Sequence, residues 1–141
     1  MILLDSNHLV VLMYPESAQY GRLVNRMQSS EDQRFALPIV ALEEQLRGWL
    51  AVIHQATEGR QQVEAYHRLA GLFEFFADWE IIRFDNAASG VFDGLRRQKV
   101  RVGTMALRLA AIALVQDALL VTADLDDFRR VPRLKVENWL Q

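Results

Sequence analysis

Short apolar runs alternate along the chain with longer amphipathic segments. Four runs predict buried strands, at residues 1–4, 35–37, 80–84 and 118–122, and a shorter run predicts an edge strand at 134–136. Between them, apolar residues recur at helical spacing over about residues 7–14, 17–29, 40–55, 58–79, 86–99 and 104–115. Strands that alternate with helices predict an α/β fold with a mostly parallel central sheet of four to five strands, flanked by helices. No linker or internal repeat interrupts this pattern, so we expect a single domain over residues 1–141.

The first apolar run ends directly in an acid, Asp5. A buried parallel strand with this pattern delivers a carboxylate to the carboxyl edge of a sheet, which is where open α/β folds bind ligands. Asp124 follows the strand at 118–122 in the same way. The pattern therefore predicts that both acids belong to one acidic metal site.

A third acid can come from the helix at 40–55, whose first turn contains Glu43 and Glu44. Acids are favoured at this place by the helix dipole alone, so their presence does not require chemistry. Adjacent helical residues point about 100° apart, and only one of the two can face a shared site. The apolar stripe through Leu42 and Leu46 leaves Glu43 at its flank, so periodicity by itself favours Glu43.

The residue types narrow the chemistry. Two strand-end aspartates and a helix glutamate form a set of hard oxygen ligands, which suits Mg²⁺ or Mn²⁺. The chain has no cysteine, and this excludes disulfides, thiolate metal sites and cysteine nucleophiles. His8, His54 and His67 lack the spacing of a zinc site, so we expect them to be surface or packing residues.

Composition describes an ordinary soluble globule, with 51% hydrophobic and 24% charged residues. The opening apolar run is too short for a signal peptide, and the longest apolar segment, at 105–115, is too short to span a bilayer. We therefore expect no membrane segment and a cytoplasmic location. The aromatics of segment 58–79, including Phe73 and Phe76, are typical of a core or a subunit interface.

One dense basic run contains Arg96, Arg97, Lys99 and Arg101. Cations are favoured at a helix C-terminus, so a solvated helix end explains the run without further function. The other interpretation is a set of RNA phosphate contacts beside an active site. The net charge of −2 adds no general signal of nucleic-acid binding, and the first interpretation is slightly favoured unless the acidic site is real.

Several short motifs occur in a characteristic order over nearly the whole chain. They are Leu3-Leu4-Asp5-Ser6-Asn7, Glu43-Glu44-Gln45-Leu46-Arg47-Gly48, Gly103-Thr104-Met105, Val121-Thr122-Ala123-Asp124, Phe128-Arg129-Arg130-Val131-Pro132 and Glu137-Asn138-Trp139. Together they resemble a PIN domain and, more narrowly, the VapC-type toxins of bacterial toxin–antitoxin pairs. The resemblance implies a three-layer α/β/α fold and an endoribonuclease that depends on Mg²⁺ or Mn²⁺ and acts on RNA. It also implies an antitoxin partner that blocks the site, and a homodimer.

The resemblance also assigns the acids by position. The first is Asp5, and the helix acid is Glu44, because the glutamate of the family stands four positions before a glycine, here Gly48. The late acid is Asp124. This assignment overrides the weak preference of periodicity for Glu43.

Three further positions match supporting residues of the family. Asn7 and Thr122 match polar residues that hold the acids in place, and Asp127 matches an auxiliary acid.

Ala106 departs from the family pattern, which has an aspartate metal ligand at this place. A methyl group cannot coordinate a cation, so we expect weakened metal binding and very low nuclease activity. Three explanations stand side by side: a substitution introduced to silence the site, a natural loss of the acid, or partial replacement by Asp126 or Asp127. The intact flanking helix favours the first.

Two other functions are compatible with parts of the pattern. A catalytically silent protein could bind an antitoxin or RNA without cleaving it. A phosphoryl-transfer domain fits less well, because the chain reads Asp5-Ser6-Asn7 where a dehalogenase-type Asp-x-Asp motif would be needed.

Overall fold

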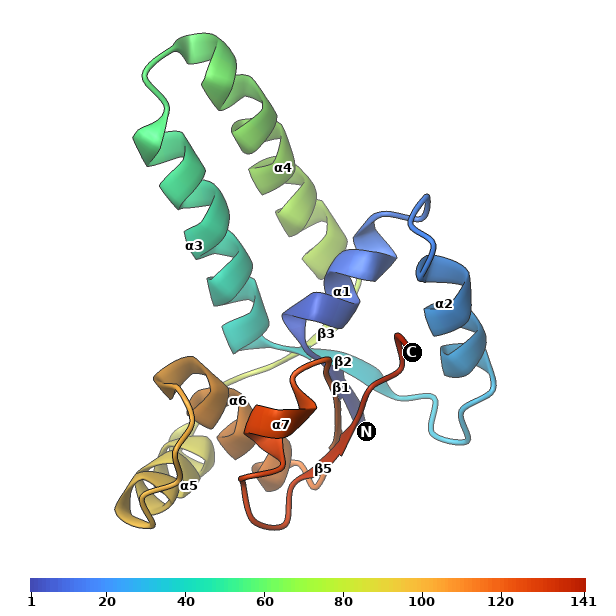
Figure 1. Cartoon of the computed structure of the whole chain (residues 1–141), viewed down its shortest axis with the longest axis vertical. Coiled ribbons are helices and arrows are strands. Elements are labelled where there is room, and N and C mark those ends of the chain that lie inside the picture. The colour runs from blue at the N-terminus through green and yellow to red at the C-terminus, as the bar shows by residue number, and fades with distance from the viewer.

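The computed structural model describes residues 1–141, and its centre is a five-stranded parallel sheet (Figure 1). The strands are β1 (Ile2–Leu4), β2 (Phe35–Pro38), β3 (Glu80–Ile82), β4 (Leu119–Val121) and β5 (Lys135–Glu137), in the order β3-β2-β1-β4-β5. All four strand pairs are parallel, and Leu3 of β1 lies between Ala36 and Leu120. The predicted parallel α/β sheet is therefore confirmed. Strands β1 to β3 are added in one direction, and the chain then crosses back to place β4 on the other side of β1. The strand order therefore reverses between β1 and β4, which is a topological switch point.

Seven helices connect the strands. They are α1 (Ser6–Met13), α2 (Tyr20–Gln28), α3 (Ile39–Gln55), α4 (Gly59–Ala77), α5 (Asn86–Arg97), α6 (Thr104–Val115) and α7 (Leu125–Phe128). Six of them correspond to predicted segments, with ends that differ by a few residues. The exception is α7, a single turn within an acidic run for which no helix was predicted.

Two apolar clusters cover the two faces of the sheet. Leu3 belongs to a cluster that is completed mainly by α5 and α6, whereas its neighbours Ile2 and Leu4 belong to a second cluster with residues from α1, α2 and α4. Successive strand residues point to opposite faces, so this division follows directly from the apolar run at the N-terminus. The expected three-layer α/β/α arrangement is confirmed.

Helices α3 and α4 form a hairpin that extends away from the sheet (Figure 1). Leu72 and Phe76 of α4 are buried, as expected for core residues. Val63, Tyr66 and Phe73 are instead exposed, by 67%, 52% and 55%, so the outer face of α4 is not part of the core. No helix combines the length and the apolar composition needed to cross a bilayer.

Candidate functional site

The acids predicted from the sequence surround one cavity at the switch point between β1 and β4. Its volume is about 800 Å³. Asp5 enters it from the end of β1, Asp124 from the loop after β4, and Glu44 from the first turns of α3. Asn7 and Asp127 also line it. The structure thus brings together Asp5 and Asp124, which are 119 positions apart in the sequence.

Asp5 is held in a fixed orientation by both of its oxygens. It caps α1, where its Oδ1 accepts a hydrogen bond from the backbone N–H of Ser6 at 2.7 Å. Its Oδ2 accepts one from the hydroxyl of Thr122 at 2.7 Å. The same Thr122 oxygen accepts the backbone N–H of Asp124 at 3.0 Å, so Thr122 links Asp5 to the backbone of Asp124. The cap position places the Asp5 carboxylate directly at the N-terminus of α1.

The pKa of the Asp5 carboxyl is raised from 3.8 to about 6. Burial of the side chain is the main cause, and the negative charges of Glu44 and Asp124 raise the pKa further. The hydrogen bonds from Thr122 and Ser6 act in the opposite direction, because they stabilise the charged form. The site therefore concentrates negative charge that a bound cation would compensate.

Glu44, and not Glu43, faces the cavity. An oxygen of Glu44 accepts a hydrogen bond from the Ser6 hydroxyl at 3.0 Å, whereas Glu43 pairs with Arg47 at 2.8 Å. The orientation of this turn is set by the buried residues Val40 and Ala41, which stand four and three positions before Glu44. The placement that periodicity favoured is therefore wrong, because the stripe beginning at Leu42 faces another part of the core.

Asn7 supports the loop after β4. Its Oδ1 lies 3.1 Å from the backbone N–H of Ala123, which donates to it. The ring nitrogen Nδ1 of His8 lies 2.7 Å from the same oxygen. Ser6 and His8 are thus site-supporting residues that the sequence analysis did not identify, and no local pattern distinguishes them.

The opposite wall of the cavity, at the start of α6, carries no acid. Gly103 caps this helix, and Met105, Ala106 and Leu109 line the cavity with apolar groups. A side chain at position 106 therefore faces the same space as Asp5. Of the two acids considered as substitutes, Asp127 lines this cavity and Asp126 does not.

Carboxylate oxygens are the ligand type that a cation such as Mg²⁺ prefers. The site has one carboxylate fewer than the family pattern, because position 106 is an alanine. Asp5, Glu44 and Asp124 are the carboxylates that would hold it. No group of three or more histidine, aspartate or glutamate side chains is close enough to form a ready-made metal site.

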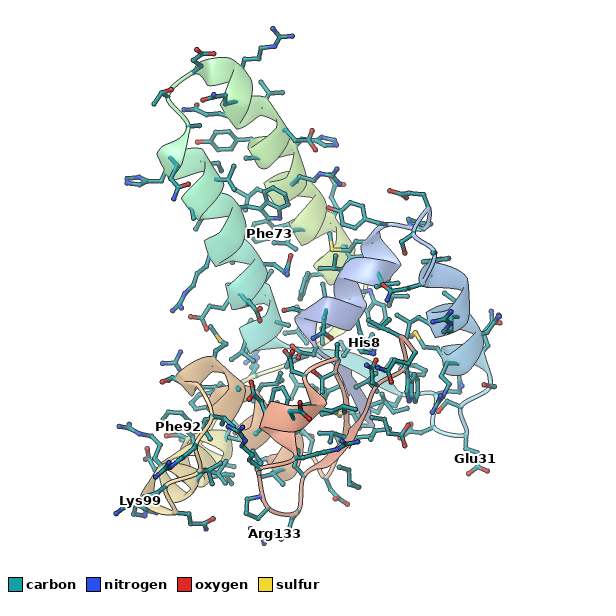
Figure 2. The ribbon with its side chains drawn as sticks, viewed as in Figure 1. His8, Glu31, Phe73, Phe92, Lys99 and Arg133 are labelled. Atoms are coloured by element: carbon teal, nitrogen blue, oxygen red, sulfur yellow. The ribbon has the colours of Figure 1, made fainter.

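The basic run lies outside the cavity lining. Arg96 and Arg97 end α5, and Lys99 follows in a left-handed turn with φ of 57°, at the periphery of the molecule (Figure 2). Arg47 of α3 is instead the basic residue that lines the cavity. This position favours the solvated helix end as the explanation of the run, and RNA contacts there remain a prediction.

Comparison with solved structures shows the same fold in toxin–antitoxin systems. A chain of DNA-bound VapBC from Salmonella typhimurium matches with a TM-score of 0.72 and 20% identity, covering 98% of this chain and 97% of the other. A chain of VapBC2 from Rickettsia felis bound to promoter DNA gives 0.69 and 23%, covering 99% of both. A toxin–antitoxin complex from Klebsiella pneumoniae gives 0.58 and 18%, covering 98% and 97%.

These identities are low, so they bear on the fold. No family model matches the chain, and no curated protein matches it in sequence. The chain has the VapC-like PIN fold that its ordered motifs predict.

Proposed function

We propose that the chain is the toxin-like member of a toxin–antitoxin pair, built as an endoribonuclease that uses Mg²⁺ or Mn²⁺ and is impaired by Ala106. The observation that carries this proposal is the convergence of Asp5, Glu44 and Asp124 on one cavity at the switch point of the sheet. The likeness to VapBC chains supports the toxin class. The same likeness supports an antitoxin as partner, and we extend the proposal to a homodimer.

The chain itself contributes orientation and charge to this reaction. Thr122 fixes the Asp5 carboxylate, and Ser6 fixes that of Glu44, so both acids are held before any ligand arrives. When bound, a divalent cation would supply the positive charge that activates water and neutralises the phosphodiester. Arg47 lies where it can receive a phosphate of the substrate.

Position 106 decides how well this site works. Its methyl group faces the cavity but offers no oxygen, so the cation would lose one ligand and bind weakly. A lost ligand should cost at least as much as the roughly 10- to 100-fold that follows from disturbing the groups behind a ligand.

Cleavage of RNA by matched variants tests the proposal. We expect the unaltered chain to cleave very slowly with Mg²⁺ or Mn²⁺, and Ala106→Asp to cleave at least about 10-fold faster, with EDTA abolishing the gain. Ala106→Asn is the control, since an asparagine side chain has nearly the same size as an aspartate but carries no charge. Equal rates for the chain and Ala106→Asp, or an equal gain in Ala106→Asn, would contradict the proposal.

A second function, silent binding of RNA or an antitoxin, is favoured because no three of these acids lie close enough together to form a ready-made metal site. A purely electrostatic RNA binder is sensitive to salt but indifferent to metal. RNA titrations of the unaltered chain with Mn²⁺ and with EDTA separate the two functions. Equal affinity in both, together with no cleavage by Ala106→Asp, identifies the silent binder.

A further inference from the structure

His8 is a fully buried histidine in the first turn of α1 that has no part in the chemistry proposed above. Its Nε2 lies 3.1 Å from the backbone nitrogen of Trp139, and its Nδ1 lies 2.7 Å from Asn7 Oδ1. A backbone N–H can only donate, so Nε2 must accept and the ring proton must be on Nδ1. The imidazole therefore accepts from the C-terminal segment and donates to Asn7.

The neutral ring is stable in this place. Burial lowers the pKa of His8 from 6.5 to about 4. The backbone N–H of Trp139 also disfavours a second ring proton, because it already donates to Nε2.

Asn7 connects His8 to the loop after β4, which contains Ala123 and Asp124. Its Oδ1 also accepts the backbone N–H of Ala123 at 3.1 Å, and the next residue is Asp124. The N–H of Asp124 is in turn held by Thr122. Two successive peptide groups beside the late acid are thus fixed by side chains, and His8 orients one of them.

The C-terminal segment has its own anchors besides His8. Arg22 donates to the carbonyl of Leu140 at 2.7 Å, and the Arg26 guanidinium lies 5.2 Å from the centre of the Trp139 ring. The indole N–H of Trp139 donates to Glu137 at 2.6 Å. The segment is therefore held against α1 and α2, and His8 lies between it and the acidic loop (Figure 2).

We propose that His8 is a positioning residue that couples the C-terminal segment to the acidic site. Its Nδ1–H fixes the Asn7 carboxamide, and Asn7 holds the Ala123–Asp124 backbone so that Asp124 faces the cavity. The hydrogen-bond coupling stands on the contacts above, and its consequence for metal binding rests on the proposed function.

Nitrogen NMR of the unaltered chain gives the first test. The ¹⁵N shifts of the His8 ring should show a protonated Nδ1 and an unprotonated Nε2 at neutral pH. A proton on Nε2 overturns the proposal, because the ring could then not accept from Trp139. This measurement needs no variant and so does not depend on a variant that folds.

Two substitutions separate positioning from space filling. In His8→Asn, the amide nitrogen takes the place of Nδ1 and can still donate to Asn7, whereas in His8→Gln the amide oxygen takes the place of Nε2 and can only serve Trp139. We expect His8→Gln to speed hydrogen exchange of the Ala123 amide about tenfold, as Asn7→Ala should, and His8→Asn to leave it within about twofold. If both His8 variants loosen this amide equally, or neither does, His8 only fills space and the proposal is wrong.

Binding of Mn²⁺ gives the second readout, in the Ala106→Asp background. His8→Gln should weaken it about 10-fold, and His8→Asn should not. Unchanged Mn²⁺ affinity in His8→Gln removes the link to the acidic site and overturns the proposal. Should no variant bind Mn²⁺, the proposed function fails, and the exchange comparison alone decides the role of His8.

Discussion

The junction between β1 and α1 and the start of α6 line the same cavity, but they contribute to it very differently. At the junction, Asp5 and Ser6 have hydrogen-bonding side chains directed at other parts of the site, and Asn7 is bonded to the loop after β4. At the start of α6, Met105 and Ala106 offer only apolar groups. The difference shows that side-chain hydrogen bonds can hold one wall of a cavity while the opposite wall offers no polar side chain.

Removing the α3 acid that Ser6 of this junction holds should have the largest effect. In the Ala106→Asp background, Glu44→Gln should weaken Mn²⁺ binding by about 10- to 100-fold, because Glu44 lines the cavity beside Asp5. Glu43→Gln is the matched control and should change it by less than about twofold, since Glu43 pairs with Arg47. Calorimetric titration measures both, and a larger effect of Glu43→Gln would contradict our placement of the helix acid.

Thr122→Val tests the link between Asp5 and Asp124. The variant removes a buried hydroxyl that donates to Asp5 and accepts from Asp124, which should lower the free energy of unfolding by about 1–3 kcal/mol. Thr122→Ser keeps both hydrogen bonds and should be closer to the unaltered chain. Urea unfolding at neutral pH measures the two variants, and an equal loss in Thr122→Ser would contradict the account, because the methyl group would then matter as much as the hydroxyl.

Asp5→Asn tests whether the buried charge of Asp5 destabilises the folded chain. With a pKa of about 6 in the folded chain and 3.8 as its ordinary value, Asp5 holds a proton in the folded state that the unfolded chain has released. The folded state therefore loses stability as the pH rises from about 4 through 6, and the loss is complete above that range. Asp5→Asn should be more stable than the unaltered chain at pH 8, on the order of 1 kcal/mol after the weaker contact with Thr122 is counted.

This advantage should vanish near the ordinary pKa of 3.8. His8, whose pKa is lowered to about 4, changes stability in the opposite sense over a similar range, but it does so in both proteins and cancels in their difference. Thermal unfolding across this pH range measures the effect. If the stability advantage of Asp5→Asn instead grew toward acid pH, the charged form of Asp5 would not be the destabilising one, and this prediction would be wrong.

The basic residues should give the smallest effect. Arg47→Gln should lower the salt slope of RNA binding by about 0.7, the value for one lost phosphate contact on a single strand. Arg96→Gln should change the slope only for RNA long enough to extend beyond the cavity, because Arg96 lies outside the lining. An equal change for short RNA in both variants would place the basic run at the site after all.

The sequence predicted the parts of the site that depend on local patterns. The apolar runs before Asp5 and Asp124 determine two strand ends, and parallel strands bring such ends to one edge. Periodicity could not predict that Glu44 faces the cavity, because the packing of Val40 and Ala41 on the sheet sets the rotation of α3 about its axis. The contact between His8 and Trp139 spans 131 positions, and no local pattern encodes it. The short α7 was missed for a related reason, since four residues are too few for a periodic signal.

The affinity for Mn²⁺ of the unaltered chain, of Ala106→Asp and of Ala106→Asn tests the contrast between the two walls most directly. Titration calorimetry at pH 8, where Asp5 is deprotonated, measures all three under the same conditions. We predict at least about 10-fold tighter binding by Ala106→Asp, and no comparable gain in Ala106→Asn. Equal affinity in the three proteins would mean that position 106 is not the missing corner of this site.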